Sequence, residues 1–134
     1  MSDINKYIFA IGGGGFTHRK DKSLDNFILS IKNKEILKIG FLPTASKDNY
    51  EKTELFYERF KKTKHKLSHF ELLKKTIGFE EWVLSNDIIY VGGGNTYFML
   101  ELWKKNNLTN IFRRAYSNGI ILCVVSAGAV CWFE

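Results

Sequence analysis

A serine near the end of the sequence stands in a pattern that would present it as a nucleophile. The stretch Val124-Val125-Ser126-Ala127-Gly128 places it between a β-branched run and small residues. A nucleophile elbow sets its serine on a sharp strand-to-helix turn, which needs small neighbours so that strand and helix can approach. The usual pattern is G-x-S-x-G, and here Val124 stands in the place of the first glycine. The pattern alone fits a serine that caps the following helix equally well.

Three consecutive glycines, Gly92-Gly93-Gly94, would supply the complementary part of such a site. Successive glycines after a strand can leave backbone N–H groups directed at a ligand, and strand–turn–helix hydrolases build their oxyanion hole in this way. The partner donor is the N–H of the residue after the nucleophile, here Ala127. Each such donor stabilises the charge on the attacked carbonyl oxygen by about 2.7–4 kcal/mol.

A second glycine run, Gly12 to Gly15, raises the alternative of a nucleotide site. A P-loop requires G-x-x-x-x-G-K-[ST], whereas this sequence continues FTHR after Gly15. A dinucleotide fingerprint needs a further glycine at Thr17 or, counted from the other glycine run, at Tyr97. Neither position is glycine, so nucleotide binding is not favoured. Part of each glycine run is also explained by a tight turn, because a turn with positive φ favours glycine.

Short apolar runs alternate with stretches of helical periodicity along the chain. We expect strands at Tyr7–Ile11, Ile36–Leu42, His69–Leu73, Asp87–Val91 and Ile120–Val125. We expect helices capped by Ser23, over about Asn49–Lys64, over Phe79–Leu84, after a cap at Asn95 or Thr96, and from Thr109 to Asn118-Gly119. Their spacing predicts buried faces that contain Leu24, Phe27, Ile28 and Ile31; Phe56, Tyr57 and Phe60; Phe98, Met99, Leu102 and Trp103; and Leu108, Ile111, Phe112, Ala115 and Tyr116.

The strand runs are continuously apolar, which is typical of a parallel sheet covered on both faces. We therefore expect an α/β fold with an open, doubly wound, flavodoxin-like parallel sheet and helices on both faces. Ligands of such sheets bind beyond the carboxyl ends of the strands. Both glycine loops, the Thr44-Ala45-Ser46 loop and Ser126 follow predicted strands. We expect them to share this one rim of the sheet.

Length and composition indicate the broad structural class of the protein. The sequence has 134 residues, 45% of them hydrophobic and 15% aromatic, which indicates one folded domain. We expect no signal peptide in the first residues, and no apolar run approaches the roughly 18 residues of a membrane span. The two cysteines, Cys123 and Cys131, lie in apolar surroundings, so we expect buried, reduced thiols and a cytoplasmic location.

The net charge of +6 is concentrated in one segment. Seven basic residues and one acidic residue between positions 59 and 75 account for all of it. We interpret this segment mainly as a solvated helix end, because no nucleic-acid-binding motif accompanies it. His65 and His69 have the i, i+4 spacing of metal ligands, but no third ligand is evident. We expect neither a metal nor a nucleic-acid partner.

Four segments together resemble the peptidase S51 family. These are IGGGGF, FLPTAS, DIIYVGGGNTYFMLELWKKNNL and VSAGAVCWFE, in this order and spacing. The family contains the α-aspartyl dipeptidases of the peptidase E type and the cyanophycinases, and its fold is like that of the class I glutamine amidotransferases. The resemblance covers essentially the whole chain, and it implies one such domain over residues 1–134. GGGNT followed by SAGA some thirty residues later is a specific combination.

The resemblance implies a serine peptidase that cleaves peptide bonds next to acidic residues and needs no cofactor. Ser126 takes the place of the nucleophile, and Gly93, Gly94 and Ala127 lie where the oxyanion hole forms. We expect Asn95, Thr44 and Ser46 to contact a small peptide substrate that carries an acidic residue.

Two features depart from the family pattern. Val124 replaces a small glycine and would crowd the elbow. The family's catalytic histidine follows the nucleophile, whereas His18, His65 and His69 all precede Ser126. We therefore expect a chain that lacks the C-terminal part of the domain, is inactive by itself, and exposes an unpaired edge beside the strand at 120–125.

Three alternatives stay open. The chain could be a non-catalytic module that binds a small ligand, or the product of a nonfunctional gene fragment. A glutamine amidotransferase-like hydrolase would need a cysteine nucleophile, and Cys131 is expected to pack in the core instead.

Overall fold

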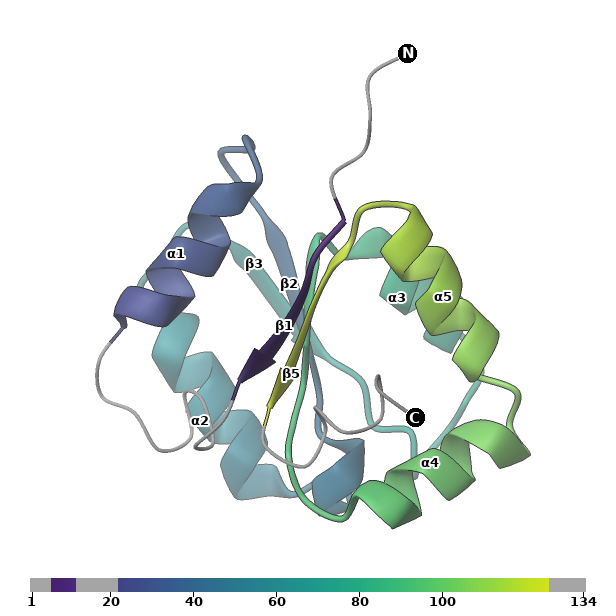
Figure 1. Ribbon diagram of the computed structural model, residues 1–134. Helices are drawn as coiled ribbons and strands as arrows, with labels where there is room; N and C mark the ends of the chain where they lie inside the picture. The colour runs from purple at the N-terminus through teal and green to yellow at the C-terminus, as the bar shows by residue number, and fades with distance from the viewer. Residues whose placement is uncertain (1–5, 12–21, 126–134) are drawn as a thin grey trace.

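The sheet of the computed structural model is open and entirely parallel. The structure describes residues 6–11 and 22–125. Within them, five strands lie in the order β1-β5-β4-β2-β3 (Figure 1). Every neighbouring pair is parallel, so the predicted α/β fold with an open parallel sheet is confirmed. The strands are β1 (Ile8–Ile11), β2 (Lys38–Leu42), β3 (Lys66–His69), β4 (Ile88–Val91) and β5 (Ile121–Val125).

Helices cover both faces of this sheet, as predicted. One face carries α1 (Ser23–Ile31) and α2 (Tyr50–Phe60), and the other carries α3 (Phe79–Ser85), α4 (Thr96–Lys105) and α5 (Thr109–Ser117) (Figure 1). Alternate residues of each strand enter the two cores, so that Ile88 and Tyr90 of β4 face α1 and α2 whereas Ile89 and Val91 face the other helices. A short 3-10 helix, η2 (Thr44–Ser46), follows β2. No helix in the described ranges is long and apolar enough to cross a bilayer.

The third strand lies three residues earlier than predicted. Lys66–His69 pairs in register with β2, whereas Phe70 and Leu72 of the predicted strand are buried after β3 has ended. These two side chains belong to the core beneath α3, and the pairing with β2 ends at the hydrogen bond from the Phe70 amide to the Phe41 carbonyl at 3.2 Å. The prediction was wrong because an apolar run reports burial and does not by itself distinguish a strand from an irregular buried segment.

Three details of the predicted helices are also wrong. Lys22, and not Ser23, occupies the N-cap position of α1. The second helix ends at Phe60 instead of Lys64, and the Thr63 hydroxyl donates to the Phe60 carbonyl 2.7 Å away just beyond that end. Phe27, predicted to face the core, is 58% exposed. The neighbouring buried position of α1 is taken by the polar residue Asp25.

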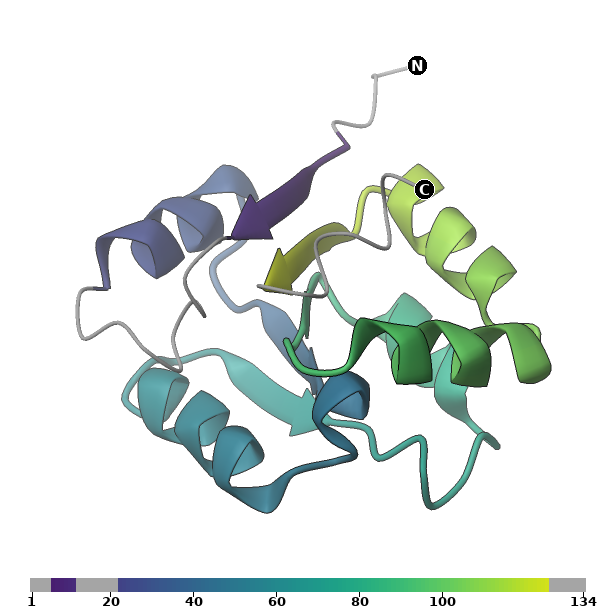
Figure 2. The same ribbon diagram turned by 60° about the horizontal axis from the view of Figure 1, so that its bottom comes forward.

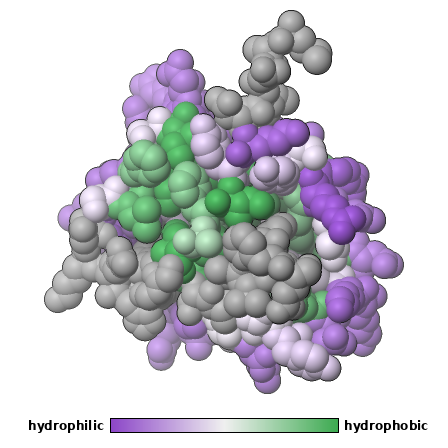
Figure 3. All heavy atoms as spheres, in the orientation of Figure 1, coloured by the Kyte–Doolittle hydropathy of each residue, from purple (hydrophilic) through white to green (hydrophobic). Residues whose placement is uncertain are grey.

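The exposed Phe27 belongs to an apolar surface along β1. Its ring meets that of Phe9 edge-on at 6.2 Å between centroids, and Phe9 stacks on Tyr7 at 5.9 Å. Figure 3 shows hydrophobic surface over α1 and β1 on this side of the molecule. We expected an unpaired edge beside the strand at 120–125, but β5 pairs with β1 on one side and β4 on the other. Among the described strands, β1 and β3 form the edges.

A buried ion pair ties α1 to α2 above the sheet. An Arg59 guanidinium nitrogen lies 3.5 Å from a carboxylate oxygen of Asp25, and both side chains are more than nine-tenths buried. The Tyr90 hydroxyl of β4 donates to the other Asp25 oxygen at 3.1 Å. Burial raises the pKa of Tyr90 well above its usual value, so its hydroxyl keeps the proton that it donates. These groups satisfy one another where water is excluded.

We predict that Asp25→Ala lowers the free energy of unfolding by about 3–5 kcal/mol, because it leaves the Arg59 charge buried without its carboxylate. Urea denaturation followed by circular dichroism measures the change. The matched control is Glu58→Ala, which removes an exposed carboxylate that pairs with Lys61 on the same helix. This control should leave the urea midpoint unchanged. Equal, small effects of both substitutions would show that the buried pair does not hold the two helices.

Candidate functional site

The turn at residues 92–95 is pinned at both ends to the segment that follows β2. The Gly92 amide donates to the Leu42 carbonyl at 3.0 Å, and the Asn95 amide donates to the Ala45 carbonyl at 2.6 Å. Between them, the amides of Gly93 and Gly94 have no hydrogen-bond partner among the described residues. Figure 2 brings the carboxyl ends of the strands forward and shows this turn leading into α4. Two adjacent N–H groups on this rim can therefore bind an anion.

Glycine is required at position 94 for two separate reasons. Its φ of +148° is rarely adopted by residues with a side chain. A Cβ there would also overlap the backbone carbonyl of Ala45. The requirement at Gly92 is milder, because a Cβ would lie 3.1 Å from the ring of Phe41. Close approach of two backbone segments thus explains the glycine at position 94.

Asn95 caps α4. The sequence predicted a cap at either Asn95 or Thr96. Its side-chain oxygen accepts a hydrogen bond from the Phe98 amide at 3.0 Å, and α4 begins at Thr96. The cap fixes the direction in which the helix leaves the glycine turn. Asn95 is exposed, and its side-chain amino group makes no hydrogen bond to the residues that the structure describes. A role for this group in substrate binding stays a prediction.

The other two predicted substrate contacts lie in η2, beside the turn. Thr44 is fully buried, and its hydroxyl has no hydrogen-bond partner within the described ranges. The Ser46 hydroxyl is half-buried and donates to the Pro43 carbonyl at 2.9 Å. Both residues thus flank the Ala45 carbonyl that holds the turn. Their contact with a substrate stays a prediction as well.

The predicted nucleophile Ser126, its neighbour Ala127 and the loop at 12–15 lie outside the described residues. The structure does place the end of β5, the strand that leads to Ser126. Val124 pairs with Val91, so the described end of β5 lies one strand spacing, about 4.8 Å, from the strand that enters the glycine turn. Val124 itself is fully buried on the face covered by α3, α4 and α5.

Neither described histidine lies beside the end of β5. The Nδ1 atom of His69 is 2.7 Å from the Tyr57 hydroxyl, and the residue ends β3, three strand spacings or about 14 Å from β5. His65 precedes β3 at the amino end of the sheet, where its Nδ1 accepts from the Leu37 amide at 3.0 Å. Burial lowers the pKa of His65. His18, the third histidine, falls outside the described ranges.

The described cysteine is not arranged as a nucleophile either. Cys123 is fully buried in β5, and burial raises the pKa of its thiol well above the usual value. A protonated, enclosed thiol is a small apolar side chain in its packing. Cys131 falls outside the described residues.

Sequence reasoning missed one residue that contacts the glycine turn. The Lys52 ammonium donates to the Gly93 carbonyl at 3.1 Å across the rim. Lys52 lies in the first turn of α2, where its own amide donates to the capping side chain of Asn49 at 2.9 Å. Acidic residues are favoured in a first turn because the helix dipole is positive there. Lys52 runs against this preference, and its position in the first turn was the feature of the sequence that could have pointed to a role outside the helix.

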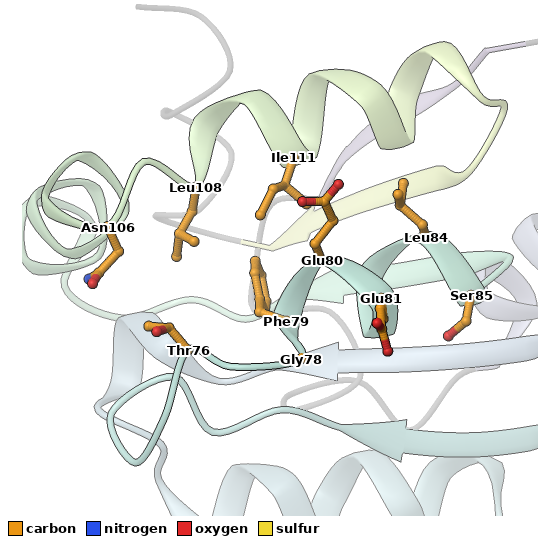
Figure 4. Close-up of a pocket in the computed structure, with 10 residues that line it drawn as sticks. All are labelled: Thr76, Gly78, Phe79, Glu80, Glu81, Leu84, Ser85, Asn106, Leu108 and Ile111. Atoms are coloured by element: carbon orange, nitrogen blue, oxygen red, sulfur yellow. The ribbon is translucent and has the colours of Figure 1, made fainter.

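A hollow of about 750 Å³ lies elsewhere, between α3 and α5 (Figure 4). Phe79, Leu108 and Ile111 line it, together with Glu80, which forms an ion pair with Arg114. None of the predicted site residues contributes to it. The candidate site is therefore the rim around residues 92–95, where two adjacent amides have no partner in the described part of the chain.

We predict that Gly94→Ala destabilises the protein by more than the roughly 1–2 kcal/mol that positive φ alone costs, because the new Cβ meets the Ala45 carbonyl. The control is Gly78→Ala. Gly78 has a φ of +86°, but a Cβ there would meet no atom within 4 Å. Urea unfolding of both variants separates the cost of positive φ from the cost of overlap between the new Cβ and the Ala45 carbonyl. If the two substitutions cost the same, the close approach at position 94 does not constrain the turn.

Comparison with known proteins identifies the family of this chain. The sequence model of peptidase family S51 matches residues 8–134. The chain is 44% identical over 131 residues to the uncharacterized peptidase YgaJ of Bacillus subtilis, a match that covers 96% of this chain. It is 34% identical over 97 residues to the uncharacterized peptidase Lin0382 of Listeria innocua, which covers 69% of this chain.

The fold is also that of a solved structure, a "Putative Peptidase E Protein" from Listeria monocytogenes. The TM-score is 0.72 at 22% identity, over 93% of this chain and 60% of that one. The chain spans 57% of the length of YgaJ and 46% of that of Lin0382. Over the part that it shares with these relatives, the chain belongs to peptidase family S51.

Proposed function

We propose that this chain carries the nucleophile and the oxyanion hole of a serine peptidase of the peptidase E type. The observation that carries the proposal is the pair of amides at Gly93 and Gly94, which have no partner in the described part of the chain. They follow β4 directly, and β4 pairs with the strand that leads to Ser126. Membership of family S51 supports the choice of Ser126 as the nucleophile.

The proposed reaction is acyl transfer through the Ser126 hydroxyl. Its oxygen attacks the carbonyl carbon of the substrate peptide bond, and a base takes the hydroxyl proton. The carbonyl electrons move onto the oxygen, where the amides of Gly93, Gly94 and Ala127 bind the negative charge. Collapse of this intermediate breaks the C–N bond, and the proton held by the base passes to the leaving amine. Water then hydrolyses the serine ester by the same route.

The proposed substrate is a small peptide that is cleaved next to an acidic residue. Two lysines support this choice. Lys52 reaches the glycine turn, and the exposed Lys47 follows η2 with its ammonium 5.3 Å from the centre of the Phe98 ring. Both belong to a chain of net charge +6. Positive charge around a binding site raises the local concentration of an acidic ligand.

A second candidate is a module that binds an acidic ligand without turning it over. The positions of the histidines favour it. His65 and His69 both lie away from the end of β5 and hydrogen-bond to other groups, so neither is placed to take a proton from Ser126. The same amides and lysines would then hold a ligand carboxylate.

Active-site labelling distinguishes the two candidates. We predict that a fluorophosphonate modifies Ser126 slowly, because its phosphorus is far more electrophilic than an amide carbon and can react with a serine that lacks a histidine base. Mass spectrometry of tryptic peptides detects the modification, and Ser126→Ala should abolish it. We further predict that the chain alone does not hydrolyse an Asp-X dipeptide at a measurable rate, because no described histidine can serve as the base. Absence of labelling, with aspartyl compounds still binding in calorimetry, would support the binding module. Absence of both would contradict both proposals.

A further inference from the structure

Lys52 makes the side-chain hydrogen bond that the middle peptide of the glycine turn has within the described ranges. The Gly92 and Asn95 amides fix the ends of the turn, but neither belongs to the peptide that joins Gly93 to Gly94. The carbonyl of this middle peptide accepts the hydrogen bond from the Lys52 ammonium at 3.1 Å. Whatever orients this carbonyl also orients the amide on its other side.

We propose that Lys52 is a positioning residue that sets the direction of the Gly94 N–H. A trans peptide is planar, and its N–H points opposite to its C=O. A lysine that holds the Gly93 carbonyl toward α2 therefore directs the Gly94 N–H away from α2. The consequence for catalysis rests on the proposed function, but the orientation itself does not.

The peptide between two glycines needs such a restraint. Neither flanking residue has a Cβ, so steric contacts that limit φ and ψ elsewhere are weak on both sides of this peptide. A rotated middle peptide would turn the Gly94 N–H away from the oxyanion and present a carbonyl oxygen in its place. An oxyanion hole depends on donors that are already oriented before charge develops.

The placement of Lys52 fits this role better than a role in helix stability. A cation in the first turn of α2 opposes the helix dipole. The Asn49 cap holds the Lys52 backbone at 2.9 Å, which anchors the base of the side chain while its ammonium crosses to Gly93. The side chain is half-buried, so the hydrogen bond is partly shielded from water.

The test combines NMR with labelling of Ser126. Lys52→Met removes the donor at similar length, and Lys52→Arg keeps a donor. The control Lys62→Met removes the same charge from an exposed residue just after α2. Residual dipolar couplings of N–H vectors in an aligned medium report their directions. We expect the coupling of Gly94 to change in Lys52→Met only, while those of Gly92 and Asn95 stay the same in every variant.

The labelling rate gives the functional readout. We expect Lys52→Met to slow fluorophosphonate modification of Ser126 by roughly 10- to 100-fold, with Lys52→Arg and Lys62→Met near the wild-type rate and all melting temperatures alike. An unchanged Gly94 coupling in Lys52→Met would overturn the proposal, as would equal slowing by Lys62→Met. If the wild-type chain is not labelled at all, the proposed function fails, and the dipolar couplings alone decide the role of Lys52.

Discussion

The close approach of the glycine turn to the carbonyls after β2 is the constraint on which the candidate site depends. Two hydrogen bonds, to Leu42 and Ala45, hold the ends of the turn, and the same proximity excludes any side chain at Gly94. Because these bonds use the amides of Gly92 and Asn95, the two amides between them have no partner among the described residues. The geometry that shapes the backbone thus also leaves unpartnered the two amides that we propose as the oxyanion hole.

The parallel sheet gives this turn its neighbours. β4 lies between β2 and β5, so the turn that follows it contacts the η2 segment on one side and faces the end of β5 on the other. The α2 helix contributes Lys52 from the opposite face of the sheet. Its position is fixed in turn by the buried contact between Arg59 and Asp25. If Lys52 positions the peptide between Gly93 and Gly94 as proposed, packing remote from the rim bears on the orientation of that peptide.

Much of this architecture could be predicted from the sequence because it depends on local signals. Continuous apolar runs predicted buried parallel strands, and the chemistry of Asn95 predicted the cap of α4. The errors arose where tertiary contacts override local patterns. Phe27 has the spacing of a core residue, but α1 is rotated so that Asp25 meets Arg59. Phe70 and Leu72 are as apolar as strand residues, yet they are buried beyond the end of β3.

The order of the strands and the reach of Lys52 had no local signal. An unpaired edge was expected beside β5, but β1 takes that place, since strand order follows from crossover connections and not from the composition of a strand. Lys52 and Gly93 are 41 residues apart, and only the fold brings them together. The roles of Ser126 and Ala127 stay predictions from the resemblance, because both residues lie outside the described part of the chain.

The most direct test of the central claim is a crystal structure of the chain after phosphonylation of Ser126. The account predicts a phosphonyl oxygen within about 2.7–3.1 Å of the Gly93 and Gly94 amide nitrogens. A phosphonyl oxygen directed into solvent, or a Ser126 side chain buried away from the glycine turn, would contradict it.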